Sequence, residues 1–487
     1  MNIKFITVLI IVLVSVVTST ASFIVYGVPA FPDTWIHIRI ASSAIVEGRV
    51  RVWDEYNTNW PLVNVILALT STVLGLDVVS TSFVVLVVNG LSIIVFYLIL
   101  RRYCSSLLRL VLLVMMLCFE PTYMSLTSSV QKESSVVFLL MLLMYIALFN
   151  RRLIPLSLLV SLGIALGHHY VSLYSSLMLT SILVLSFIYE LKGVFRVSGV
   201  FWLIMSIVVM ALYQVFQGSK FIGVMERVRI GVDDVLLSFF FLAIAIPYAY
   251  YRGRRIVSLI EYLGILTMLA FYIYARMGYI YAINTPPISG LEYLVIAGYL
   301  LLLFFTPRKN PIELGMLISP TLAIGLYSLV FEPIYGSLVL IIKAIRRAIP
   351  VIVLLNAVNK RRVLLSITAI LLSLGFILHL MGSAVFGGSA LYDYGEYISV
   401  CMISSLGKGS VVYGSWRFVE MARALGLNAS TAHPFTKVNG LIAIMLGDRV
   451  RGVMLRCAFE WLPYTAIQAG ESTIFDSEYL KLYYESP

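Results

Sequence analysis

The sequence predicts an all-α polytopic membrane protein with about 13 transmembrane helices and a small extracytoplasmic α/β domain at its C-terminal end. Of the 487 residues, 60% are hydrophobic and 12% are charged, about half the charged share of a typical soluble domain. Apolar runs near the ~20 residues that cross a bilayer recur along the chain, and they give way to other patterns after residue 385. The mean hydropathy of +0.97 excludes a soluble globular protein.

The N-terminal segments set the topology. Residues 3–26 are expected to be a retained first span with a cytoplasmic N-terminus, because Lys4 lies at their start and a signal-peptide cleavage site is lacking. Residues 27–78 then form a first outer loop that contains juxtamembrane helices. Its last run, 61–77, is apolar but short and interrupted by Asn64, so two interpretations compete. This run either crosses the membrane or lies along the outer interface.

The interfacial interpretation gives a consistent topology for the rest of the multi-pass region, residues 1–385. Predicted cytoplasmic loops then carry more than the whole net charge of +11, as the positive-inside rule requires, because the outer loops and residues 386–487 are each slightly negative. The charge is therefore a signal of membrane orientation, and no nucleic-acid partner is expected. The expected location is the plasma membrane, where membrane lipid surrounds the chain. The later spans are expected at about 79–99, 105–119, 134–149, 153–167, 171–189, 198–216, 235–251, 256–274, 291–306, 311–330, 345–359 and 363–385.

Residues 386–487 read as a separate extracytoplasmic α/β domain. The run 411–414 predicts a buried strand that leads into a helix at 416–425, which Gly426 ends. The closing residues alternate like one arm of a hairpin. Neither a GxGxxG motif nor a P-loop lysine is present, so a nucleotide substrate is not expected.

Ionisable side chains collect on the predicted outer face. Because lipid penalises such groups, they are candidates for a function. Asp33 is the first catalytic candidate. It suits a general base for an acceptor hydroxyl, or a ligand of Mg²⁺ or Mn²⁺ shared with a second carboxylate. Glu133, where a later span starts from outside, is the candidate second carboxylate for both roles. The alternatives are a helix N-cap for Asp33 and a helix-entry residue favoured by the macrodipole for Glu133.

Further outer residues are candidates for substrate binding. A helical rhythm over 34–46 places His37 one turn from Asp33. Arginines suit a lipid-linked phosphate because guanidinium groups pair bidentately with its oxygens, although attraction to anionic headgroups is the alternative. The consecutive His168 and His169 are expected to point about 100° apart on a regular helix, too far to chelate one ion. The full candidate set is His37, Arg39, Asp54, Glu55, His168, His169, Arg276, Arg346 and Arg347.

The first outer loop resembles that of GT-C superfamily glycosyltransferases, notably archaeal members. The similar segments are Asp-Thr-Trp-Ile-His-Ile-Arg at 33–39, Glu-Gly-Arg-Val at 47–50 and Trp-Asp-Glu-Tyr-Asn-Thr-Asn-Trp-Pro at 53–61. The resemblance implies a sugar donor linked to a lipid phosphate, an inverting transfer, and a first-loop acid that matches Asp33. The second acid of the family falls nearest Glu133, with Glu120 as the alternative. The WWDYG motif of oligosaccharyltransferases is absent, so enzymes similar to protein O-mannosyltransferases or aminoarabinose transferases fit better.

These features predict an integral membrane glycosyltransferase. It would transfer a sugar from a polyprenyl (dolichyl) phosphate to a protein, lipid or glycan acceptor outside the cell. A secondary transporter is one alternative, but it should show paired internal repeats and midplane charges, whereas the acids here lie in loops. A non-catalytic GT-C-like scaffold is the other alternative.

Overall fold

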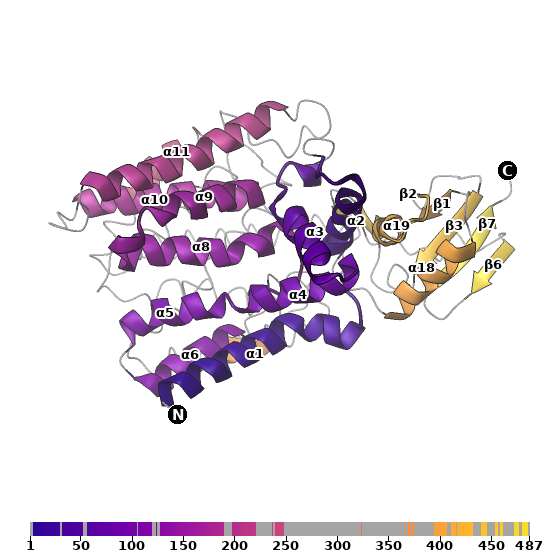
Figure 1. Ribbon diagram of the computed structural model, residues 1–487, viewed down its shortest axis with the longest axis horizontal. Helices are drawn as coiled ribbons and strands as arrows, with labels where there is room; N and C mark the ends of the chain where they lie inside the picture. Colours follow the sequence, from indigo (N-terminus) through magenta and orange to yellow (C-terminus); the bar gives the residue numbers. More distant parts are fainter. Residues whose placement is uncertain are drawn as a thin grey trace, which may run out of the picture.

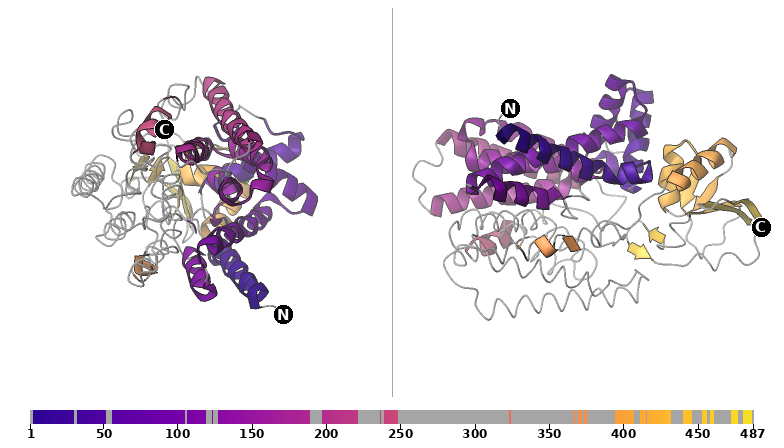
Figure 2. Two further views of the ribbon diagram at one scale, coloured as in Figure 1. Left: turned by 90° about the vertical axis from the view of Figure 1, so that its left-hand side faces the viewer. Right: turned by 90° about the horizontal axis from the view of Figure 1, so that it is seen from below.

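The computed structural model shows a helical bundle that occupies one end of the molecule and a unit with β-strands at the other (Figure 1). Figure 2 shows the same arrangement from two further sides. The structure describes residues 3–29, 32–51, 56–104, 106–118, 123, 127–188, 197–220, 236, 239–247, 323, 366, 369–371, 373–374, 394–406, 411–414, 416–431, 440–445, 453–455, 458–460, 472–476 and 480–485.

Most helices of the bundle run alongside one another in Figure 1. Four helical segments are long and apolar enough to cross a membrane: Val78–Arg102, Lys132–Phe149, His169–Phe187 and Gly199–Phe216. This finding agrees with a polytopic membrane protein; most of the spans expected after residue 220 lie outside the described residues. The bundle helices are α1 (Ile3–Tyr26), α4 (Val78–Gly90), α5 (Ile93–Tyr103), α6 (Leu107–Cys118), α8 (Lys132–Phe149), α9 (Leu156–Gly167), α10 (His169–Ile188) and α11 (Val197–Lys220).

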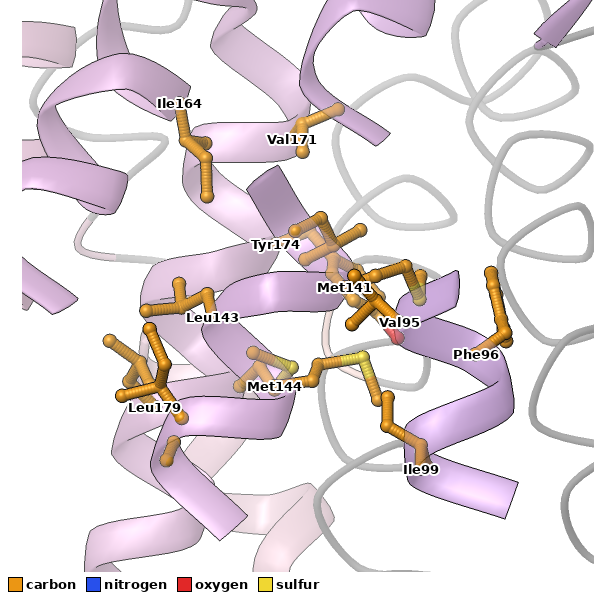
Figure 3. Packing of buried hydrophobic residues seen from close by; sticks show 14 of the residues in the cluster. Val95, Phe96, Ile99, Met141, Leu143, Met144, Ile164, Val171, Tyr174 and Leu179 are labelled. Carbon is orange, nitrogen blue, oxygen red and sulfur yellow. The ribbon is translucent and has the colours of Figure 1, made fainter. Parts of the chain in front are cut away.

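Leucine, isoleucine, valine and methionine fill the interior of the bundle. In Figure 3, Met141 and Met144 of α8 lie between residues of α5 and α10, such as Ile99 and Leu179. The flexible thioether side chains suit irregular gaps between helices of different tilt. Other large apolar side chains, among them Leu13 and Leu212, are more than half exposed. A band of exposed apolar side chains is costly in water but favourable in a lipid bilayer.

Helices α2 (Pro32–Glu47) and α3 (Leu62–Leu74) lie at one end of the bundle and are steeply inclined to its helices (Figure 1). The helix expected over 34–46 therefore forms, with α2 somewhat longer at both ends. Gly75 ends α3 with a left-handed φ of 63°, and α4 then starts at Val78. The run at 61–77 is thus a separate helix from the one that follows it, as both interpretations of this run require.

Small residues allow close contacts between neighbouring helices. A Cβ on Gly90 of α4 would lie 2.6 Å from Ser19 Oγ of α1. In the same place, Ser15 Oγ donates a hydrogen bond of 2.8 Å to the Gly90 carbonyl. Between α8 and α9, a Cβ on Gly167 would lie 2.1 Å from Val136 Cγ1. Membrane helices associate through such backbone approach because lipid gives little hydrophobic drive for their contact.

The C-terminal part contains a five-stranded sheet in the order β2-β1-β3-β7-β6. Strand β1 is parallel to both neighbours, whereas β7 is antiparallel to β3 and β6. The strand and helix expected at 411–414 and 416–425 form as β1 and α19, and Gly426 follows with a φ of 82°. The elements are α18 (Tyr394–Leu406), β1 (Val412–Gly414), α19 (Trp416–Ala424), β2 (Ala429–Thr431), β3 (Gly440–Met445), β4 (Val453–Leu455), β5 (Ala458–Glu460), β6 (Ser472–Asp476) and β7 (Leu480–Glu485).

Helix α2 joins the C-terminal part to the bundle. Trp35, which is fully buried, stacks on Tyr397 of α18 with ring centroids 5.8 Å apart. One turn later, Arg39 Nε lies 3.8 Å from Glu420 Oε2 of α19. Buried apolar residues of α2, α3 and α4 share one core with residues of α18, α19 and β1. The C-terminal part is therefore packed directly on the helix that carries Asp33 and His37.

Candidate functional site

The two predicted carboxylates lie at the N-terminal ends of helices whose starts are hydrogen-bonded to each other. Asp33 is in the first turn of α2 and Glu133 is in the first turn of α8, and both side chains are partly buried. The backbone N–H of Val130, just before α8, donates to Thr34 Oγ1 at 3.3 Å. Helix N-termini favour negative charge, so both positions suit a carboxylate side chain.

The structure also bears on the alternative roles of these acids. Helix α2 begins at Pro32, so Asp33 lies inside the first turn rather than before it. In α8 the cap consists of Gln131 and Ser134, whose side chains and backbone N–H groups bond reciprocally, with Gln131 N donating to Ser134 Oγ at 2.8 Å. Glu133 lies in the first turn of α8, which is also the position that its alternative role, a helix-entry residue favoured by the macrodipole, requires.

His37 lies one turn after Asp33 on α2 and contacts α3. Its Nδ1 is 2.7 Å from Asn64 Oδ1, and Asn64 Nδ2 donates to the carbonyl of Asn57 at 3.1 Å. Burial, followed by the Lys132 ammonium and the Arg39 guanidinium, lowers the pKa of His37 to about 3, although the hydrogen bond to Asn64 opposes this shift. The imidazole is therefore neutral near pH 7.

A column of stacked side chains joins the starts of α8 and α10. Lys132 Nζ lies 4.9 Å from the centroid of the Trp60 ring. The Trp60 ring packs against His169 at 4.7 Å, and His169 stacks on His168 at 4.6 Å. All four side chains are buried. A cation over an indole face is stabilised by the ring quadrupole, especially away from water.

The geometry of the two histidines corrects the prediction that their rings diverge. Helix α9 ends at Gly167 and α10 begins at His169, so His168 lies between two helices in an extended conformation, with φ −160° and ψ 126°. This break turns the rings to within 19° of parallel. In addition, the backbone N–H of Val171 donates to His168 Nδ1 at 3.3 Å, so this side chain caps α10. The expectation of a 100° separation fails because it assumed one continuous helix.

The loop between α2 and α3 completes this region. Its 3-10 turn η1 (Tyr56–Thr58) is followed by Asn59, whose carbonyl accepts a hydrogen bond from Tyr213 Oη of α11 at 3.0 Å. We call the buried polar residues around this loop the helix-end cluster. Its members are His37, Asn59, Trp60, Asn64, Lys132, His168 and His169.

Sequence reasoning overlooked four members of this cluster. Neither Lys132 nor Trp60 is among the candidate residues named from the sequence. Asn64 was read as an interruption of a span rather than as a partner for His37, and Asn59 was not singled out. A lysine or asparagine next to a long apolar run is the signal that could have identified them, because lipid penalises both.

The remaining predicted residues are elsewhere. Arg39 lies at the contact with α19, beside Glu420. Asp54, Glu55, Arg276, Arg346 and Arg347, and the alternative acid Glu120, lie outside the described residues. Within the part of the chain that the structure describes, no group of three or more histidine, cysteine, aspartate or glutamate residues could hold a metal ion.

Comparisons with known proteins find similar solved structures but no similar sequence family. The sequence matches no protein-family model, and a search of curated proteins finds no match. The fold is similar to that of a solved archaeal oligosaccharyltransferase. For the apo crystal structure of the Archaeoglobus fulgidus enzyme, the identity is 10% and the TM-score 0.49, over 91% of this chain and 70% of that chain.

Two further structures of the Archaeoglobus fulgidus enzyme show the same level of similarity. One is in complex with an inhibitory peptide and a dolichol-phosphate, with 10% identity and a TM-score of 0.48 over 87% of this chain and 64% of that chain. The other is tethered to an acceptor peptide, with 10% identity and a TM-score of 0.49 over 87% of this chain and 63% of that chain. At these values the similarity concerns the overall fold alone.

Proposed function

We propose that this chain is an integral membrane glycosyltransferase that uses a polyprenyl (dolichyl) phosphate-linked sugar as donor. The observation that carries the proposal is the location of Asp33 and Glu133 in the first turns of α2 and α8, at the same end of an apolar bundle as the helix-end cluster. A lipid-linked donor keeps its chain in the bilayer and its sugar at the surface, where such a site would meet it. The active face would be extracytoplasmic, with a cytoplasmic N-terminus, in the plasma membrane.

The reaction would be an inverting displacement. Asp33 would take the proton of the acceptor hydroxyl as that oxygen forms a bond to the anomeric carbon. The bond between the anomeric carbon and the phosphate oxygen would break at the opposite face, and the polyprenyl phosphate would leave with the electron pair. Lys132 and the arginines predicted from the sequence, Arg276, Arg346 and Arg347, would offset the charge on this leaving group.

A divalent cation, Mg²⁺ or Mn²⁺, fits the acids at the helix ends in number and type. Magnesium is commonly held by one or two carboxylates together with waters and substrate phosphates, so it does not require a cluster of three protein ligands. In this alternative to the general-base role, Asp33 and Glu133 would hold the ion. When bound, it would polarise the phosphate oxygens of the donor and stabilise the charge that develops on the leaving group.

The acceptor is proposed from two observations. The solved complexes of the archaeal oligosaccharyltransferase contain a dolichol-phosphate and a peptide, which makes a lipid-linked donor and a peptide acceptor the first pair to test. This chain lacks the WWDYG motif, so we propose transfer to a hydroxyl of a protein, lipid or glycan rather than to an asparagine amide.

A transfer assay tests the proposal. The purified protein in lipid would be given a panel of radiolabelled polyprenyl-phosphate sugars, with wild type beside Asp33→Asn and Glu133→Gln. Loss of a general base lowers the rate roughly 10²- to 10⁴-fold. Glu47→Gln is the matched control, because Glu47 lies at the far end of the same helix and pairs with Arg51 on the surface at 2.6 Å.

The outcomes separate the functional classes. Transfer or donor hydrolysis by wild type and Glu47→Gln, but not by Asp33→Asn, would support the enzyme. Binding of polyprenyl phosphate without any turnover would indicate a non-catalytic scaffold. If the protein neither turns over the donors nor binds the lipid, transport becomes the function to test.

A further inference from the structure

The two ring nitrogens of His37 differ in what they can do. The carbonyl oxygen of Asn57 only accepts hydrogen bonds, so the Asn64 amide must turn its NH₂ group toward it. Asn64 Oδ1 therefore faces His37, and because this oxygen also only accepts, His37 Nδ1 must carry the proton. A neutral imidazole with a proton on Nδ1 has its lone pair on Nε2. Asn64 thus sets the tautomer of His37.

The lone pair on Nε2 has no hydrogen-bond partner among the described residues, although the side chain is only 2% exposed. Asn59 is a more extreme case: its side chain is fully buried, and neither its amide nitrogen nor its amide oxygen has a partner in the part of the chain that the structure describes. Buried polar atoms are hydrogen-bonded in the great majority of cases, so each exception requires a reason.

Both residues belong to one small region. Asn57, which orients Asn64, is two residues before Asn59 in the same loop. Trp60, next to Asn59, lies under the Lys132 ammonium, and the charge of this ammonium also lowers the pKa of His37. The helix-end cluster therefore combines one acceptor at His37, one donor and one acceptor at Asn59, and one positive charge at Lys132.

A sugar with several hydroxyl groups on a rigid ring matches these requirements, because each hydroxyl can both donate and accept a hydrogen bond. The positive charge suits the phosphate to which the sugar is linked. We propose that His37, held in one tautomer by Asn64, accepts a hydrogen bond from a hydroxyl of the transferred sugar. Asn64 is then a positioning residue and His37 a specificity-determining one. This inference rests on the proposed function.

Nitrogen NMR tests the tautomer without any donor. The chain contains five histidines, so ¹⁵N-histidine labelling gives few signals, and His37→Phe identifies those of His37. We expect a protonated Nδ1 and a bare Nε2 in wild type and in Asn64→Asp, whose carboxylate is also an acceptor. In Asn64→Leu the two tautomers should mix. Asn89→Leu is the matched control, because Asn89 is also buried but donates to the carbonyl of Ser129, and it should leave the His37 signals unchanged.

A second experiment tests the sugar contact. Donors that lack one hydroxyl at a time would be given to wild type and to His37→Phe. One deoxy donor should lower the transfer rate of wild type roughly ten- to hundredfold. His37→Phe should show a similar loss of rate with the full donor. With that deoxy donor, the rate of His37→Phe should fall no further. This pattern marks the two groups as partners.

Three results would overturn the inference. A proton on Nε2 in wild type would refute the tautomer. Transfer that His37→Phe and the deoxy donors reduce independently would refute the contact while the proposed function stands. A lower affinity of His37→Phe than of wild type for Mn²⁺, measured by titration of the purified protein, would make Nε2 a metal ligand instead. If wild type transfers no sugar from any donor, the proposed function fails as well, and the NMR result alone then decides whether Asn64 sets the tautomer.

Discussion

The contact between Gly167 and Val136 is a sensitive point of the bundle. Gly167 ends α9 and lies directly before His168, and Val136 is one turn after Lys132 on α8. A Cβ on Gly167 would lie 2.1 Å from Val136 Cγ1 and 3.1 Å from Leu62 Cδ2. Carbon atoms in contact are about 3.5 to 4.0 Å apart, so Gly167→Ala forces these helices apart by more than 1 Å unless side chains rearrange. Val136 is fully buried, which leaves it little space to move.

Overpacking of this kind costs typically about 1 to 3 kcal/mol. We therefore expect Gly167→Ala to lower the apparent melting midpoint of the protein in lipid nanodiscs by a few degrees. Transfer activity should fall further than stability, because the movement displaces the start of α8 relative to His168 and His169. Thermal unfolding followed by tryptophan fluorescence, and the transfer assay at a temperature well below the midpoint, measure the two effects separately.

Two further variants control this experiment. In Gly163→Ala, one turn earlier on α9, the new Cβ meets, among the described residues, only the terminal methyl of Leu139 at 2.9 Å, which can rotate away, so this change should cost little. In the double variant Gly167→Ala with Val136→Ala the clash is removed, and the two substitutions should destabilise by about 0.5 to 3 kcal/mol less than the sum of the single effects. Equal stability of Gly167→Ala and wild type, or simple additivity in the double variant, would refute this packing argument.

Two other predictions follow from the charges around α2. The pKa of His37 is lowered from the ordinary 6.5 to about 3 in the folded protein. Between about pH 3 and pH 6.5, the unfolded chain therefore binds a proton at His37 that the folded chain does not bind. The free energy of unfolding should therefore fall as the pH drops through this range, by at most about 1.4 kcal/mol per pH unit. His37→Phe should remove this part of the pH dependence. Unfolding midpoints measured across the pH range test this. Reversal of either charge in the pair of Arg39 and Glu420 should loosen the C-terminal part by about 1 kcal/mol, since Arg39 is partly exposed, and increase its cleavage in limited proteolysis. The double reversal should restore protection; failure to do so would show that the pair does not contribute to this contact.

Several elements were predictable because their signals are local. Helix α2 follows the apolar rhythm of residues 34–46, and β1 with α19 follows the strand and helix patterns before Gly426. The end of α3 at Gly75 is also local, since a left-handed φ is readily adopted by glycine. Local patterns of this kind depend on the chemistry of consecutive residues and not on what they contact.

The helix-end cluster was only partly predictable. His37, His168 and His169 were candidates from their residue type and their loops, but the sequence offers no sign that Trp60 packs between Lys132 and His169. The stacked histidines could not be anticipated, because one break between α9 and α10 reverses the expectation for a continuous helix. Similarly, the approach of Glu420 to Arg39 joins residues far apart in the chain.

The sequence by itself determined that this protein is built of apolar helices, where its N-terminal helices and first C-terminal strand form, and which residue types are available for chemistry next to the apolar runs. Length and periodicity of apolar runs are sufficient for this, because burial in lipid acts on each segment separately. Only the tertiary structure decided that α2 is held between the bundle and α19, that Asn64 orients His37, and that Lys132 lies over Trp60. These contacts depend on helix angles and on close approach at small residues, which arise from the simultaneous packing of segments distant in sequence.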